Sequence, residues 1–204
     1  MREIILISFL GPDQPNQFTR LMQVLSAHSL QILDVGQAVI HNQLTLGIVV
    51  ASDDQTATAL AMKEILILAH DIGLTVRFKP ISATEYDQWV KEGGRTRYIV
   101  TALAPELNAS HLQAVTQIVS AQGFNIETVT RLSGRPALDG SSTGPKRACI
   151  EFGLKGQMLD AAARRAACLR LSSELNVDVA VQEDNAYRRN RRLVCFDMDS
   201  TLIE

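Results

Sequence analysis

Two copies of one structural unit make up most of this chain, and they are related by a shift of 94 residues. At that shift "LSAHSLQILDV" (25–35) lies over "VSAQGFNIETV" (119–129), with Ser, Ala, Ile and Val recurring at the same places. "EIILISFLG" (3–11) then lies over "RYIVTALAP" (97–105), and both are strand-like. A register that persists through a strand, a helix and a second strand indicates a duplicated folding unit. We therefore expect two domains of the same kind.

The apolar pattern predicts the same order of elements, βαββαβ, in each copy. In the first copy we expect strands at 4–10, 30–40, 44–50 and 74–78, and helices at 18–25 and 56–71. In the second copy we expect strands at 97–103, 124–132, 148–154 and 177–182, and helices at 112–119 and 159–169. This order favours a four-stranded antiparallel sheet with two helices on one face, which is the ferredoxin-like layout. The predicted fold class is therefore α+β.

The domain limits follow from the same pattern. The first domain is expected at 1–83 and the second at 95–184. Between them, "TEYDQWVKEGG" (84–94) is polar and ends in Gly-Gly, so we interpret it as a connector in which Trp89 packs against a domain. Residues 185–204 follow as a linker and the beginning of a further segment.

Composition and charge exclude several classes of function. The net charge is −2, and no apolar run approaches the ~18 residues that a membrane-spanning helix needs, so we expect no membrane partner. RNA binding on such a sheet needs aromatic residues on its face, but aromatics are 5% of the chain and no strand has that pattern. The basic "RRNRR" (188–192) is interpreted as a solvated linker, so no nucleic-acid partner is expected. Three scattered cysteines indicate a reducing compartment, and we expect a cytoplasmic protein.

The loop "GPDQPN" (11–16) joins the first strand to the first helix. Gly11 permits unusual backbone dihedrals, Pro15 suits a first helical turn, and Asp13 or Gln14 could cap the helix. The loop is then either a plain capped turn or a site where the free N–H groups of the helix hold an anion such as an α-carboxylate. At the shift of 94, Pro105 lies under Gly11. The second copy thus lacks this glycine, and the first loop is the more specialised one.

Two βαββαβ units with a G-x-D-x-P loop after the first strand resemble tandem ACT domains. The resemblance implies that an amino acid binds at a domain–domain interface, where this loop and the start of the second strand contact it. It also implies that the chain pairs into a homodimer. One departure is that the family often has Gly where Asn16 stands. Carried over to this sequence, the ligand-binding residues are Gly11, Asp13, Pro15 and Asn16, with Ile32 and Leu33 as further candidates.

The chain ends on "FDMDSTLIE" (196–204), where two carboxylates stand one residue apart after an apolar strand. In an extended segment residues i and i+2 point the same way, so Asp197 and Asp199 can face one substrate. Asp197 would be a nucleophile that attacks phosphorus, and Asp199 would be the general acid and base. Mg²⁺ would bridge the Asp197 carboxylate, the Asp199 carbonyl and the phosphoryl group.

This ending closely resembles the first catalytic motif of the haloacid dehalogenase superfamily, and specifically of phosphoserine phosphatases. The resemblance implies the regulatory front of an Mg²⁺-dependent enzyme of serine biosynthesis, cut inside its α/β catalytic domain. That enzyme would hydrolyse O-phospho-L-serine to L-serine and phosphate through an aspartyl-phosphate. We expect L-serine as a candidate effector, and no activity from these 204 residues alone. The alternative is an ACT-type dimerisation scaffold that binds no ligand.

Overall fold

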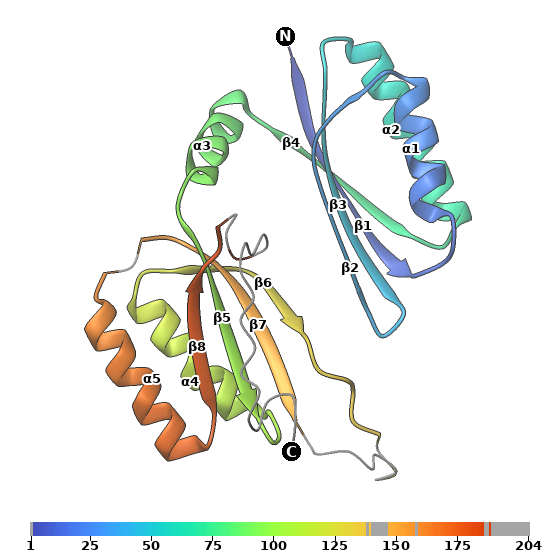
Figure 1. Cartoon of the computed structure of the whole chain (residues 1–204). Helices are drawn as coiled ribbons and strands as arrows, with labels where there is room; N and C mark the ends of the chain where they lie inside the picture. The colour runs from blue at the N-terminus through green and yellow to red at the C-terminus, as the bar shows by residue number, and fades with distance from the viewer. Residues whose placement is uncertain (1, 138, 140–146, 158, 186–187, 189–204) are drawn as a thin grey trace. The chain divides into compact units, whose positions relative to one another are not determined.

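The computed structural model describes residues 2–137, 139, 147–157, 159–185 and 188. The chain divides into two compact units, Met1–Gly93 and Gly94–Glu204, and each is described here by itself (Figure 1). Of the predicted linker and beginning of a catalytic domain (185–204), only Asn185 and Arg188 belong to the described residues.

The first unit is a four-stranded antiparallel sheet with strand order β2-β3-β1-β4, and α1 and α2 cover one of its faces (Figure 1). A third helix, α3, follows the last strand. The elements in chain order are β1 (Glu3–Pro12), α1 (Gln17–Ala27), β2 (Gln31–Ile40), β3 (Gln43–Ser52), α2 (Gln55–Asp71), β4 (Thr75–Ile81) and α3 (Ala83–Gly93).

The core of the first unit lies between the sheet and its two helices. Ile7 and Phe9 of β1 alternate toward the helices, where they pack in one cluster with Leu21 of α1 and Ile65 of α2. All four side chains are at most 1% exposed. Burial of one apolar stripe per element is what holds the helices on the sheet, because each such side chain contributes about 1.5–3 kcal/mol.

The segment predicted as a connector is the helix α3. Its start is a reciprocal cap: the Glu85 carboxylate accepts from the Ser82 N–H and hydroxyl, each at 2.8 Å, and the Glu85 N–H donates to Ser82 Oγ at 3.2 Å. Tyr86 packs on the sheet face opposite α1 and α2, against the cluster around Val49. Trp89 is 45% exposed and lies against the Tyr86 ring at 5.8 Å. Tyr86 thus makes the sheet contact that was predicted for Trp89.

The second unit repeats the layout, with strand order β6-β7-β5-β8 and with α4 and α5 on one face (Figure 1). Its elements are β5 (Arg97–Ala104), α4 (Ala109–Ala121), β6 (Asn125–Arg131), β7 (Ala148–Lys155), α5 (Ala161–Leu175) and β8 (Asp178–Glu183). The predicted α+β class, with two ferredoxin-like βαββαβ units, is confirmed.

One part of the repeat alignment was wrong, namely the register of the first strands. At the shift of 94, Ile5 lies over Ile99, yet Ile5 belongs to the core under the helices and Ile99 alternates with the core residues of β5. The pairing of each first strand with the last strand of its unit shows that Phe9 corresponds to Ala102. Phe9 lies opposite Val76 on β4, and Ala102 lies opposite Val179 on β8. Counting on from these pairs, the residue at the position of Gly11 is Ala104, and Pro105 is one residue beyond it.

Candidate functional site

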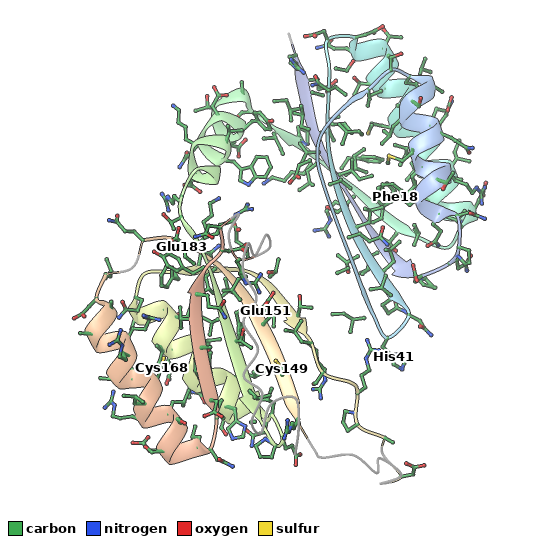
Figure 2. The ribbon with its side chains drawn as sticks, in the orientation of Figure 1. Phe18, His41, Cys149, Glu151, Cys168 and Glu183 are labelled. Carbon is green, nitrogen blue, oxygen red and sulfur yellow. The ribbon has the colours of Figure 1, made fainter. Side chains whose placement is uncertain are left out.

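The loop between β1 and α1 lies at one end of the first sheet. The Asp13 N–H donates to the Asn42 carbonyl at 2.8 Å, which ties the loop to the β2–β3 turn. That turn is formed by His41 and Asn42, both with positive φ, as two-residue hairpins prefer (Figure 2). Asp13, Pro15 and Asn16 are all exposed. The exposed loop residues Asp13, Pro15 and Asn16 therefore lie on an accessible surface at the turn end of the β2–β3 hairpin.

Gly11 is required by a close approach of two backbones, and the expected unusual dihedrals are not found. It lies in the extended strand β1, and its φ is not among the positive values of the described glycines. A Cβ at this position would lie 2.7 Å from the Gly73 carbonyl oxygen and 2.9 Å from Leu74 Cδ2. Gly11 thus lets the end of β1 pass against the turn that follows α2.

Asn16 is the residue in the left-handed conformation, with φ 67° and ψ 0°. Asn adopts this region more readily than other side chains, so it can stand where the ACT family often has Gly. Asn16 is also the N-cap of α1, a role expected of Asp13 or Gln14, and it makes no side-chain cap hydrogen bond. Pro15 precedes the helix and does not lie in its first turn.

The two copies begin their first helices differently. In α4, Asn108 accepts from the His111 N–H at 3.1 Å, and the His111 ring accepts from the Asn108 N–H in return. In α1 the N-cap Asn16 gives no such cap, so the first N–H groups of the helix, which have no intrahelical partner, are not taken up by its side chain. The two copies therefore differ in the capping of this helix, and the specialisation of the first loop stays a prediction.

Gln17 holds the loop in place, and the sequence pattern did not single it out. Its side chain is buried, at 3% exposed. Its Nε2 donates to the Pro12 carbonyl at 3.1 Å and to the Ile72 carbonyl at 3.3 Å, while its Oε1 accepts from the Gln14 N–H at 3.0 Å. One amide side chain therefore joins the loop, at Pro12 and Gln14, to the turn after α2.

The further candidates Ile32 and Leu33 lie at the other end of the sheet. Ile32 pairs with Val50 on β3, whereas Gly11 pairs with Leu44, six residues along the same strand. At about 3.4 Å per residue this separates them by roughly 20 Å. A β-bulge leaves Leu33 unpaired, and a bulge at Glu127 of β6 stands at the matching place in the second copy. One unit alone does not bring the loop and the start of β2 to the same small ligand.

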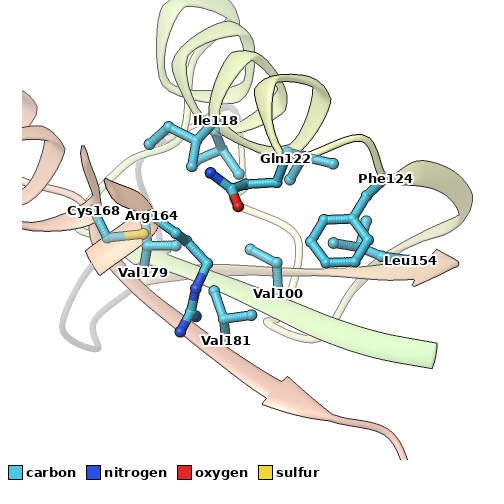
Figure 3. A pocket seen from close by; sticks show the side chains of 11 residues that line it. Val100, Ile118, Gln122, Phe124, Leu154, Arg164, Cys168, Val179 and Val181 are labelled. Carbon is cyan, nitrogen blue, oxygen red and sulfur yellow. The ribbon is translucent and has the colours of Figure 1, made fainter. Parts of the chain in front are cut away.

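The second unit encloses a small cavity of ≈ 10 Å³ between α4, α5 and the sheet (Figure 3). Phe124 and Val181 line its apolar part, and Arg164 and Cys168 line it from α5. Burial raises the pKa of the Cys168 thiol, an effect that the charge of Arg164 opposes. This volume has room for about one water molecule, so it is not a pocket for an amino acid.

The predicted catalytic pair, Asp197 and Asp199, and the Mg²⁺ site built on it lie outside the described residues. Among the residues that the structure does describe, no group of three or more His, Cys, Asp or Glu side chains is placed to hold a metal ion. Nor does any described helix combine the length and the apolar character that crossing a membrane requires.

Comparisons with known proteins show what this chain is similar to. The ACT domain family matches residues 3–79, which lie in the first unit, and the chain has two ACT-like folds in tandem. A crystal structure of an unknown protein from Galdieria sulphuraria has the same fold, with a TM-score of 0.71 and 15% identity, and covers 91% of this chain and 100% of its own. A putative glycine cleavage system transcriptional repressor also shares it, at TM-score 0.61 and 11% identity over 90% of this chain and 98% of its own.

Two curated relatives of this chain are phosphoserine phosphatases. Phosphoserine phosphatase SerB2 of Mycobacterium tuberculosis is 30% identical over 202 residues, which is 98% of this chain and 46% of the relative. A phosphoserine phosphatase of Streptomyces coelicolor is 28% identical over 206 residues, or 98% of this chain and 45% of the relative. The chain thus spans about half the length of these two relatives. Together with the ACT match, they fit the ACT-containing front part of a phosphoserine phosphatase.

Proposed function

We propose that this chain is the amino-acid-binding, regulatory part of a cytoplasmic phosphoserine phosphatase of serine biosynthesis. The observation that carries the proposal is the similarity to two phosphoserine phosphatases along 98% of the chain. The sequence motif at Asp197 and Asp199 supports it from the other end of the chain. In this proposal residues 185–204 are the linker and the start of the catalytic domain.

The whole protein would hydrolyse O-phospho-L-serine in two steps. A carboxylate oxygen of Asp197 bonds to phosphorus while the bond from phosphorus to the serine oxygen breaks, and Asp199 gives that oxygen its proton. Asp199 then takes a proton from water as the water oxygen attacks the aspartyl-phosphate, which releases phosphate and restores Asp197. Carboxylate oxygens are ligands that suit Mg²⁺, and the ion, when bound, offsets the repulsion between carboxylate and phosphate.

The test of the enzymatic part compares two lengths of chain. A protein that continues through the rest of a catalytic domain should release phosphate from O-phospho-L-serine with Mg²⁺, and Asp197→Asn should abolish this. Glu174→Gln, which changes an exposed acid of α5, should leave the rate unchanged. The 204-residue chain should be inactive. Mg²⁺-dependent turnover by the short chain, lost in Asp197→Asn, would contradict the assignment of a regulatory part.

For ligand binding we propose a site between two copies of the first unit. The loop and the start of β2 are roughly 20 Å apart within one unit, as the pairing distances give. Two copies joined through β2 in antiparallel orientation would bring the loop of one beside the start of β2 of the other. Strand β2 is an edge strand in which every residue except the half-buried Leu33 is exposed. Such an edge pairs readily with another strand, and this supports a homodimer.

Calorimetry with L-serine tests the binding site. Asn16→Gly keeps the left-handed backbone but removes the amide, and should weaken binding about fivefold if one hydrogen bond of ~1 kcal/mol is lost. Pro105→Ala, in the loop of the second copy, should have no effect. Equal losses in both variants would place the ligand elsewhere, and an absence of heat with the unchanged protein would exclude L-serine as the ligand.

The exposed edge also favours the alternative function, a dimerisation scaffold. Ile32, Val35, Val39 and Ile40 leave apolar surface on β2, from 39% to 74% exposed. Val35→Lys should convert a dimer to monomers in light scattering, because a charge on an edge strand opposes pairing. A dimer that dissociates in this variant but binds no amino acid would establish the scaffold and refute the sensor.

A further inference from the structure

The chain does not leave the second unit freely after β8. The Asp184 N–H donates to the Arg97 carbonyl at 2.8 Å, which extends the β5–β8 pairing by one more bond. The Arg188 N–H then donates back to Asn185, at 3.1 Å to its carbonyl and 3.3 Å to its side-chain oxygen. Asp184, Asn185 and Arg188 are therefore held together and against the unit by backbone hydrogen bonds.

The side chain of Arg188 fastens these residues to the sheet. Its Nη2 lies 2.6 Å from Glu151 Oε2 and its Nη1 lies 3.6 Å from Asp184 Oδ1. The three side chains are 24%, 22% and 16% exposed for Arg188, Glu151 and Asp184. Arg188 was interpreted as part of a solvated linker, and that interpretation was wrong for this residue.

These contacts reach across the sheet. Glu151 is on β7 and Asp184 directly follows β8, with β5 between the two strands (Figure 2). Glu151 also pairs with Thr130 on β6, which is the edge strand of this sheet. The guanidinium of Arg188 thus joins the segment that follows β8 to β7, the strand that pairs with the edge strand β6. Charge-assisted bonds of this kind, once largely desolvated, are costly to break on one side only.

We propose that Arg188 is a positioning residue that clamps the exit of the second unit to β7, so that the segment after it starts from a fixed point on this sheet. For its functional meaning the inference rests on the proposed function, since that segment carries Asp197 and Asp199. Because Glu151 also pairs with Thr130 of β6, the clamp lies one strand from the edge of the sheet. The clamp is thus a contact through which the second unit can bias the position of a catalytic domain.

Backbone amide exchange in the 204-residue chain tests the clamp without any assay of activity. Glu151→Gln keeps the shape of the side chain but removes its charge, and should accelerate exchange at Asp184 and Arg188 about tenfold, as expected for the loss of one charge-assisted bond. The matched control is Glu183→Gln, an exposed acid on β8 (Figure 2), which should change neither amide.

A second variant tests the same contact in case Glu151→Gln disturbs the structure of β7. Arg188→Gln lies outside the strands and should accelerate Asp184 exchange at least as much, because it removes the ion pairs with both Glu151 and Asp184. Adding Glu151→Gln to Arg188→Gln should change the exchange no further, because the bond to Glu151 is already lost. Unchanged exchange in Arg188→Gln, or equal effects of Glu151→Gln and Glu183→Gln, would overturn the clamp. Neither result depends on phosphatase activity, so failure of the clamp and failure of the proposed function are distinguishable.

Discussion

Replacing Gln17 by Leu tests whether the loop of the first unit is held as the structure shows. Leucine fills nearly the same volume, so no large cavity is left, but it can make none of the three hydrogen bonds to Pro12, Ile72 and Gln14. At about 1 kcal/mol net for each bond, the free energy of unfolding should fall by roughly 3 kcal/mol. The cost falls in the first unit alone, since every partner belongs to it.

The assay is urea unfolding followed by the fluorescence of Trp89, the single tryptophan of the chain, which reports on the first unit. With a slope of about 1–3 kcal/mol per M, the midpoint should fall by about 1–3 M. The control is Gln23→Leu, an exposed position on the same helix, which should stay within about 0.5 kcal/mol of the unchanged protein. A Gln17→Leu midpoint equal to that of Gln23→Leu would refute the reasoning.

Three further changes have distinct expected outcomes. Gly11→Ala should cost about 1–3 kcal/mol of unfolding free energy in urea, because its Cβ meets backbone, whereas Gly36→Ala, with nothing within 4 Å, should be neutral or stabilising; equal effects would contradict the close approach. Hydrogen bonds from the backbone N–H of Ser82, and then from its hydroxyl, lower the pKa of Glu85. The ionised Glu85 therefore stabilises α3 above the unfolded-state pKa, and this stabilisation is lost as the pH falls through the folded-state pKa. Trp89 fluorescence in an acid titration should report this loss of stabilisation, and the Glu85→Gln variant should lack this pH-dependent change. Cys168, whose pKa burial raises, should be alkylated at pH 8 more slowly than a free cysteine, in a chain whose other cysteines are replaced by serine.

Periodicity predicted the strands and helices of both units because each element buries one face. It could not determine the register of the first strands, since both are apolar on both faces: Ile4 and Ile5 are each buried, and so are Ile99 and Val100. When neighbouring residues are equally apolar, alternation does not distinguish the faces, and a slip of one residue costs nothing in the pattern. The helix α3 was missed because its residues are polar, although Ser82 and Glu85 have the spacing of a capping box.

The candidate loop could be located from the sequence, but the roles of its residues could not. Gly11 and Gln17 act through Gly73 and Ile72, which are distant in sequence and adjacent only in the fold. A glycine that avoids a distant backbone looks the same in a sequence as one that needs a positive φ. The left-handed residue was Asn16, and its position just before the helix was the signal that could have identified it.

The bulges in β2 and β6 bear on the history of the molecule. Leu33 and Glu127 are unpaired at the same place in two copies that otherwise differ widely, and we infer that the ancestral single unit already carried the bulge before it was duplicated. The occupant has since diverged. Leu33 packs in the apolar cluster beneath Tyr86, while Glu127 lies between the cations of Lys155 and Arg97, at 3.4 Å and 3.7 Å. The backbone bulge is thus present in both copies, but its residue makes apolar contacts in the first copy and ion pairs in the second.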